Sequence, residues 1–513
     1  MNLISLQFGV FFGGSLFLYY VTPVKLRWWV LLAASAAFYL LSATPFTALY
    51  LVFSIVSVYF GARYITEEKS KHKKAAYIIV LCANVALILM LKYMNGLWVA
   101  SHRVFSLIGV NLPHFELGWI APLGMSFYML QLIGYLTDVY WGISPAQRNI
   151  MKLTLFASYF PSLSSGPILR YNQIEDELFQ GHPATYRNIT FGAQRMLWGL
   201  FKKMVIAERL AAITSTIFSD IGVYTGVWLW VGIFASIIQI YADFSGNMDF
   251  IIGASQCFGV VLPENFRQPF FSLTIQEFWQ RWHITLGSWL KDYIMYPLQH
   301  SALWVKLGKS IKTSLGKKAA KLIPTFLALL VLWLVNGLWH GGYPKYFATV
   351  SWFWFAVISG QLLKPVGDKT VRLFSINTNC FSWRLFQRMR TIAVYSVGAL
   401  FFAAPGIMDA LRIAKRALLA RNFFELFSPN TFFSDKLLGV TGGIGGLRVL
   451  LVSFLLLVAV EVFQNRDKHV REWLAKQNLV FRWAFLLGLI FAILLFGIYG
   501  PGYNASDFIY AGF

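Results

Sequence analysis

The chain has 513 residues, of which 57% are hydrophobic and only 13% are charged. Soluble domains are typically about 45–50% apolar and about 25% charged. This composition excludes a disordered protein and argues against a soluble enzyme. At roughly 20 apolar residues per membrane helix, the length accommodates about eleven or twelve spans. We therefore predict an all-α polytopic membrane protein.

The formal net charge of +22 would suggest nucleic-acid binding in a soluble protein. Here Lys and Arg cluster between apolar runs, which is typical of cytoplasmic loops in membrane proteins. We therefore expect these basic residues to lie beside a lipid bilayer, and we expect no nucleic acid partner. The three cysteines have no metal-ligand spacing, and no metal is expected.

Apolar runs follow one another along the whole chain, and several are too short for a complete span. We expect these short runs to be re-entrant or buried helices within one membrane domain covering residues 1–513. Six lysines lie between Lys306 and Lys321 without an acidic neighbour, which predicts a cytoplasmic loop. The tail Pro501–Phe513 carries only Asp507 and is expected on the outer face. The runs are near residues 4–22, 28–42, 46–62, 75–92, 119–141, 151–165, 190–214, 225–243, 322–344, 346–363, 391–404, 446–463 and 481–500.

Polar residues inside apolar runs are informative because burying them in a membrane is costly. The first group interrupts the run at 119–141, where hydrogen bonding between helices is the favoured explanation. The second, Gly166-Pro-Ile-Leu-Arg170, ends a run and by itself indicates only the start of a loop. The first group consists of Ser126, Gln131, Tyr135 and Asp138.

A third group begins with Gln239 and Asp243, which are four residues apart and share a helix face. The sequence Ser245-Gly246-Asn247 follows, and we expect it to break the helix. A discontinuous helix around a water-filled site and simple capping at the membrane interface are equally compatible with this pattern.

The fourth group starts where Thr274 and Glu277 have capping-box spacing, which predicts a helix from Ile275. If that helix runs straight to Asp292, one face is a polar stripe and His283 lies on another side, near Gln280. An amphipathic helix at the interface explains the stripe but not the second polar face, so a buried site is favoured. The stripe consists of Glu277, Arg281, Thr285, Ser288 and Asp292.

A second histidine, His340, lies in a run from Leu322 to Pro344 that contains no Lys, Arg, Asp or Glu. Asn336 is one helical turn earlier and can hold the imidazole ring. Gly337, Gly341 and Gly342 leave space beside it. Helix packing and a functional site are equally compatible with this histidine.

These motifs together resemble the membrane-bound O-acyltransferase family, and within it the alginate O-acetyltransferase membrane subunits and the D-alanyl-lipoteichoic-acid transfer proteins. They occur in the family's order, and the motif-bearing core covers residues 119–363. Where alginate-type members often have Gly-Gly-Asn-Arg after the first histidine motif, this chain has Pro297-Leu-Gln-His-Ser-Ala, so the resemblance leaves the acceptor open. The motifs are Pro122-Leu-Gly-Met-Ser-Phe, Gly166-Pro-Ile-Leu-Arg170, Asp243-Phe-Ser-Gly, Glu277-Phe-Trp-Gln-Arg-Trp-His283 with Trp289-Leu-Lys-Asp-Tyr, and Asn336-Gly-Leu-Trp-His340-Gly.

The resemblance implies a helical core around a tunnel, with His340 as the catalytic histidine and His283 as its partner. A neutral imidazole is a suitable base near pH 7 for a hydroxyl that attacks a thioester. Asn336 and His283 are candidate donors to the developing oxyanion. Supporting polar residues are expected at Asp243, Gln239 and Gln280, and basic loops around Arg170, Lys202 and Lys203 are candidates for holding donor phosphates.

The resemblance further implies an acyltransferase of the bacterial cytoplasmic membrane with no tightly bound cofactor. We expect acetyl-CoA or a related thioester as donor and O-acetylation of an extracellular or cell-wall polysaccharide as the outcome. The chain lacks the Gly-Asp-Ser motif of SGNH-type transferases, so an extracytoplasmic partner of that type, or an acceptor protein, is expected. Two alternatives remain: D-alanyl transfer from a carrier protein to teichoic acid, and a proton-coupled transporter or flippase.

Overall fold

A computed structural model describes residues 1, 3–107, 110, 122–422, 424–425, 439 and 441–499. The described residues are predominantly helical, and the one β-type pairing among them is an isolated antiparallel bridge between Phe266 and Trp282. This confirms the predicted all-α class. The predicted outer-face tail, Pro501–Phe513, lies outside the described residues, as do residues 119–121 of the predicted core.

The chain packs as two compact units. The first contains residues 1–193 and 251–263, and the second contains residues 194–250 and 264–512. Helices α9 (Tyr186–Leu200) and α11 (Val227–Cys257) contribute residues to both. A single membrane domain over residues 1–513 stays a prediction.

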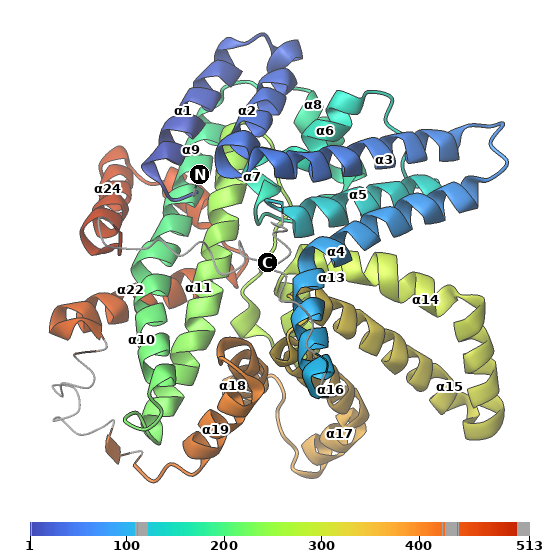
Figure 1. The fold of residues 1–513 in the computed structure, drawn as a ribbon. Helices are drawn as coiled ribbons and strands as arrows, with labels where there is room; N and C mark the ends of the chain where they lie inside the picture. The colour runs from blue at the N-terminus through green and yellow to red at the C-terminus, as the bar shows by residue number, and fades with distance from the viewer. Residues whose placement is uncertain are drawn as a thin grey trace. The chain divides into compact units, whose positions relative to one another are not determined.

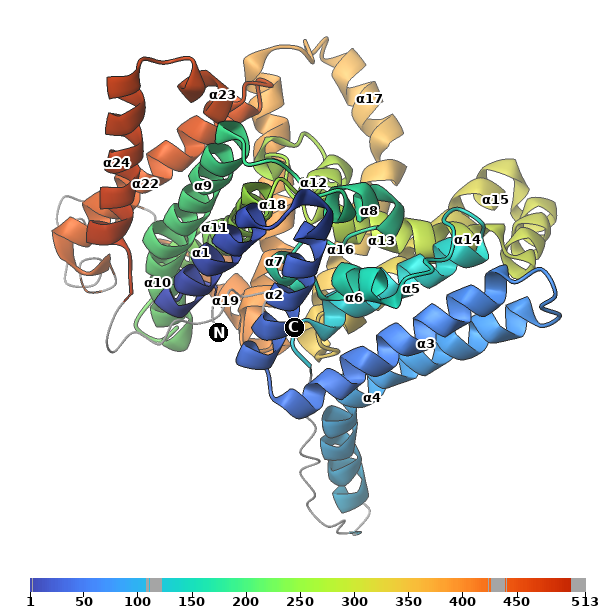
Figure 2. The ribbon, with the colours of Figure 1, turned by 90° about the horizontal axis from the view of Figure 1, so that it is seen from above.

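The first unit is an assembly of helices around the buried helix α5. Every residue of α5 from Met125 to Val139 is buried, and α3 packs against both α4 and α5, as Figures 1 and 2 show. Gly124 precedes α5 with a φ of 68°, and a Cβ there would lie 2.0 Å from the Leu163 carbonyl oxygen. The unit contains α1 (Leu6–Val21), α2 (Arg27–Ser42), α3 (Ala48–Thr66), α4 (Lys73–Leu107), α5 (Met125–Tyr140), α6 (Ile150–Ser158), α7 (Phe160–Leu163) and α8 (Tyr171–Phe179).

The second unit holds the elements that position both candidate histidines. Helix α15 packs against α16, and α16 packs against α18. The unit contains π-helix η3 (Phe201–Ala207), α10 (Glu208–Ser219), 3-10 turn η4 (Pro269–Phe271), α12 (Ile275–Arg281), α13 (Ile284–Leu290), π-helix η5 (Lys291–Met295), α14 (Tyr296–His300), α15 (Ala302–Trp339), α16 (Pro344–Leu362), α17 (Lys364–Leu373), α18 (Phe381–Ala403), α19 (Ile407–Leu418), α22 (Gly443–Gln464), α23 (Val470–Ala475) and α24 (Leu479–Phe496).

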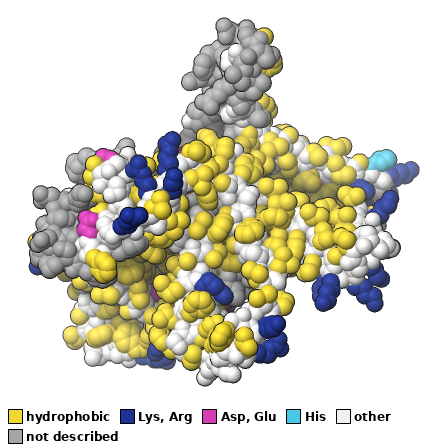
Figure 3. All heavy atoms as spheres, turned by 90° about the horizontal axis from the view of Figure 1, so that it is seen from below, with side chains coloured by type: hydrophobic (Ala, Val, Ile, Leu, Met, Phe, Trp, Pro, Cys, Tyr) yellow, Lys and Arg dark blue, Asp and Glu magenta, His cyan; other side chains and the backbone are white. Residues whose placement is uncertain are grey.

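Seven helices among the described residues are long and apolar enough to cross a membrane, or eight if the bent pair α16 and α17 is one span. This is fewer than the eleven or twelve expected, because runs such as α1 and α5 form helices of only 16 residues. In α24, only Leu489 and Ile493 are buried, so its apolar surface is available to lipid. Figure 3 shows a face rich in hydrophobic side chains, on which Asp and Glu are rare.

Three local predictions are wrong. Helix α11 continues through Ser245-Gly246-Asn247, because Gly246 allows close packing and a Cβ there would lie 2.9 Å from the Gly199 carbonyl oxygen. The helix from Ile275 stops at Arg281 instead of reaching Asp292. The segment Lys306–Lys321 is helical and kinked at Gly316 (φ 84°), so it is not a loop.

Candidate active site

The break after α12 is caused by pairing with a distant segment of the same unit. Thr274 caps α12 by accepting a hydrogen bond from Glu277 N at 3.1 Å, so the predicted start at Ile275 is confirmed. The chain then pairs with residues 265–267: Arg267 N donates to the Arg281 carbonyl at 2.9 Å, and Ile284 N donates to the Asn265 carbonyl at 3.0 Å. Since this pairing requires extended backbone, helix geometry ends there.

His283 occupies the connection between α12 and α13 in a left-handed conformation, with a φ of 47°. Its side chain is nearly enclosed (5% exposed), and its Nδ1 lies 3.3 Å from Asn265 Oδ1. Phe244 meets the imidazole edge-on, at 4.8 Å between ring centroids. Burial, and after it the charge of His340, hold the pKa of His283 well below its ordinary value, so the ring is neutral near pH 7.

His340 ends α15 as its C-terminal capping residue. Its backbone N donates to the Asn336 carbonyl at 3.1 Å, and its side chain is 9% exposed. Gly341 and Gly342 follow with positive φ values of 127° and 69°, so these glycines form the turn that stops the helix. Phe402 packs edge-on against the imidazole, at 5.7 Å between centroids.

Both histidines line one cavity of about 320 Å³ in the second unit. Among the residues that the structure describes, its wall is mainly aromatic and aliphatic without Asp or Glu, and Asn336 and Gln280 are among its polar groups. Such a chamber can hold an apolar-bodied reactant while a few polar groups orient it. The aromatic wall residues are Trp279, Trp282, Trp333, Tyr346, Phe353, Tyr395 and Phe402.

Four of the site residues expected from the sequence, His283, His340, Asn336 and Gln280, line this cavity, while two other expected supporting residues are elsewhere. Asp243 and Gln239 do not line the cavity, to which α11 contributes Ile240. Asp243 is buried in an ion pair with Lys203 (2.5 Å between Oδ1 and Nζ), and Lys203 also contacts Glu208 at 2.7 Å.

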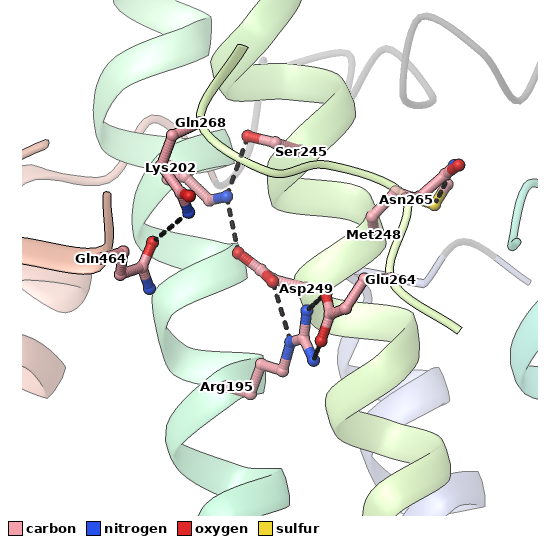
Figure 4. Close-up of polar contacts among 9 residues, drawn as sticks. All are labelled: Arg195, Lys202, Ser245, Met248, Asp249, Glu264, Asn265, Gln268 and Gln464. Atoms are coloured by element: carbon pink, nitrogen blue, oxygen red, sulfur yellow. Dashed lines mark hydrogen bonds and ion pairs between the residues drawn. The ribbon is translucent and has the colours of Figure 1, made fainter. Parts of the chain in front are cut away.

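The donor-phosphate residues predicted for basic loops are not in loops. Lys202 and Lys203 belong to η3, and both are 2% exposed. Figure 4 shows Lys202 donating to Asp249 at 2.6 Å and to Ser245 at 2.8 Å. Carboxylates therefore already neutralise both lysines. Arg170, the residue before α8, lies in the first unit, outside the unit that holds the cavity.

Two residues with a place in this site were not anticipated from the sequence. Asn265 contacts His283 and Thr285, and Arg195 binds the neighbouring Glu264 through both carboxylate oxygens, at 2.7 and 2.5 Å. The signal available was a short polar segment, Pro263-Glu-Asn-Phe-Arg267, between two helices. Within the described residues, no group of three or more His, Cys, Asp or Glu is arranged to hold a metal ion.

Comparison with known proteins identifies the relatives of this chain. The model of the membrane-bound O-acyltransferase family matches residues 145–389. A probable alginate O-acetylase of Pseudomonas putida is 31% identical over 77% of this chain and 76% of the relative. A peptidoglycan O-acetyltransferase of Helicobacter pylori is 30% identical over 77% of this chain and 74% of the relative. A teichoic acid D-alanyltransferase of Bacillus subtilis is 29% identical over 44% of this chain and 55% of the relative.

The five motifs, the two histidines at one cavity and these relatives agree. They leave no support for the transporter alternative, since each named relative transfers an acyl group. The chain belongs to the membrane-bound O-acyltransferase family, and it is an acyltransferase.

Proposed function

We propose that this chain takes an acetyl group from a cytoplasmic thioester, acetyl-CoA or an acyl carrier protein, and passes it through the bacterial cytoplasmic membrane for O-acetylation of an extracellular or cell-wall polysaccharide. The observation that carries the proposal is the largely apolar cavity with His283 and His340 in its wall. An acetyl thioester is small and uncharged at its reacting end, which suits this wall. The phosphates of its carrier remain outside.

In the proposed reaction, His340 is the general base. The acceptor oxygen attacks the thioester carbonyl carbon while its proton passes to the His340 imidazole. The carbon–sulfur bond then breaks, and the leaving thiolate takes the proton back. General-base assistance contributes about 10²–10⁴ in rate. The side-chain amide of Asn336, in the same wall, is the proposed donor to the oxyanion.

Acetyl is favoured over D-alanyl by the extent of the similarity. The alginate O-acetylase and peptidoglycan O-acetyltransferase relatives are matched over 76% and 74% of their lengths, and the D-alanyltransferase over 55%. The apolar wall without Asp or Glu also offers no carboxylate to a D-alanyl ammonium group. D-alanyl transfer to teichoic acid remains the second candidate because such enzymes are relatives.

The donor is tested on the purified chain in liposomes, supplied with acetyl-CoA or with a D-alanyl carrier protein. We expect thioester cleavage with acetyl-CoA and little with the D-alanyl carrier. Polymer acetylation should require co-expression of an extracytoplasmic SGNH-type partner, because only the acyl group crosses the membrane in this scheme. Preference for the D-alanyl carrier would make D-alanyl transfer the first candidate. Efficient polymer acetylation by the chain alone would refute the proposed need for an extracytoplasmic partner.

The side of the membrane is tested at Ser310, an exposed residue on the lysine-rich first arm of α15. In a variant without native cysteines, Ser310→Cys should react with an impermeant thiol reagent only after the membrane is opened. Ser506→Cys, which lies outside the described residues, should react in intact cells. Labelling of both from the same side would contradict this topology.

A further inference from the structure

The segment that pairs with His283 is itself firmly anchored. Arg195 binds both carboxylate oxygens of Glu264, and its Nε donates to Asp249 Oδ1 at 2.8 Å. Lys202 holds the second oxygen of Asp249 at 2.6 Å. Figure 4 shows this chain of contacts from η3 through α11 and α9 to Glu264. These contacts hold the backbone at Glu264 in place, and with it the position of the next residue, Asn265.

That residue, Asn265, is fully buried, and its amide orientation is determined by its neighbours. Thr285 N lies 3.0 Å from its Oδ1. A backbone N–H can only donate, so the atom facing it must be the amide oxygen, while Nδ2 lies against Met248 Sδ at 3.1 Å. The same oxygen is 3.3 Å from His283 Nδ1. Because an amide oxygen only accepts, His283 Nδ1 carries a hydrogen.

A neutral imidazole with its hydrogen on Nδ1 has its lone pair on Nε2. Asn265 does not line the cavity, whereas His283 does. The ionisable groups that share this wall are His340, Lys291, Tyr346 and Tyr395. On α11, the neighbouring Asp243 is engaged by Lys203.

We propose that Asn265 is a positioning residue that fixes His283 as the Nδ1–H tautomer, so that Nε2 and not Nδ1 carries the lone pair of the ring. The inference deepens the proposed function and rests on it for its catalytic meaning. A lone pair at Nε2 stabilises the positive charge that forms on His340 when that residue takes the hydroxyl proton. It also removes neutral His283 from the oxyanion donors expected from the sequence and leaves Asn336 in that role.

The uncharged amide matters as much as its position. A carboxylate at residue 265 would accept the same hydrogen bonds but favour the imidazolium, which has no lone pair. An opposite charge within about 4–6 Å shifts a pKa by about 1–3 units. Asparagine therefore orients the ring and leaves it neutral.

The tautomer is read by solid-state NMR of the full chain in liposomes, labelled with ring-¹⁵N histidine. His283→Gln identifies the His283 signals among the eight histidines. We expect a protonated Nδ1 and a bare Nε2 at neutral pH in the natural chain, and loss of this single state in Asn265→Ala. A protonated Nε2 with a bare Nδ1 in the natural chain overturns the proposal. This reading uses no substrate, so it stands or falls separately from the proposed function.

The catalytic consequence is read from the pH profile of kcat/KM for thioester cleavage. Asn265→Asp should move the acid limb upward by about one unit or more, with lower activity on that limb and recovery at higher pH. The matched control is Asn84→Asp, another fully buried asparagine, which bonds to Ser57 and the Val80 carbonyl in the first unit. Its acid limb should not move. An equal loss at every pH in Asn265→Asp would show a merely structural role and contradict the proposal.

Discussion

Replacing His340 by alanine is expected to lower kcat for acyl transfer by at least 10²-fold, and by up to about 10⁴-fold if general-base assistance is lost completely. Among the described residues of the cavity wall, His283 and His340 are the side chains whose ordinary pKa is near neutrality, and His340 is the one at the end of α15. The measurement is single-turnover acyl transfer in proteoliposomes. His283→Ala should also impair transfer.

The His340→Ala chain should still insert and fold. His340 caps α15 through its backbone N, and alanine can make the same hydrogen bond. The matched control is His300→Ala, an exposed histidine at the end of α14, whose activity should stay within about twofold of the natural chain. Near-normal turnover in His340→Ala would refute the catalytic assignment.

The second large effect concerns stability. Lys203→Met should destabilise the protein by about 3–5 kcal/mol, because Asp243 and Glu208 would remain buried without their shared cation. The measurement is equilibrium unfolding in detergent. Lys309→Met, at an exposed lysine of α15, should change the free energy of unfolding by less than about 0.5 kcal/mol.

Adding Asp243→Asn and Glu208→Gln to Lys203→Met should recover much of the lost stability, since removal of a whole buried charge group is far less costly than removal of one partner. This outcome also separates the two interpretations of the lysine. If Lys203 held donor phosphates, its replacement would raise KM for the donor and leave the unfolding free energy unchanged.

Local sequence signals predicted the local parts of the site well. Thr274 marked the start of α12, and the uncharged run around Asn336 and His340 led to one wall of the cavity. The break at His283 could not be predicted in this way, because residues 265–267 impose it from outside the helix. The α11 partners of Lys202 and Lys203 were hidden for the same reason, because Asp249 and Asp243 are 47 and 40 residues away in sequence.

The ion pairs between η3 and α11 also constrain how the protein is made. A charged side chain at the centre of a bilayer costs about 2.5–3.5 kcal/mol during insertion by the translocon. Lys202 and Lys203 on one helix meet Asp249 and Asp243 on the other. Inserted alone, the η3 segment would bring Lys202 into lipid without its carboxylate, and α11 would bring Asp243 and Asp249 without their cations, whereas together these charges are paired. We therefore expect α11 to have left the ribosome before the η3 segment leaves the translocon.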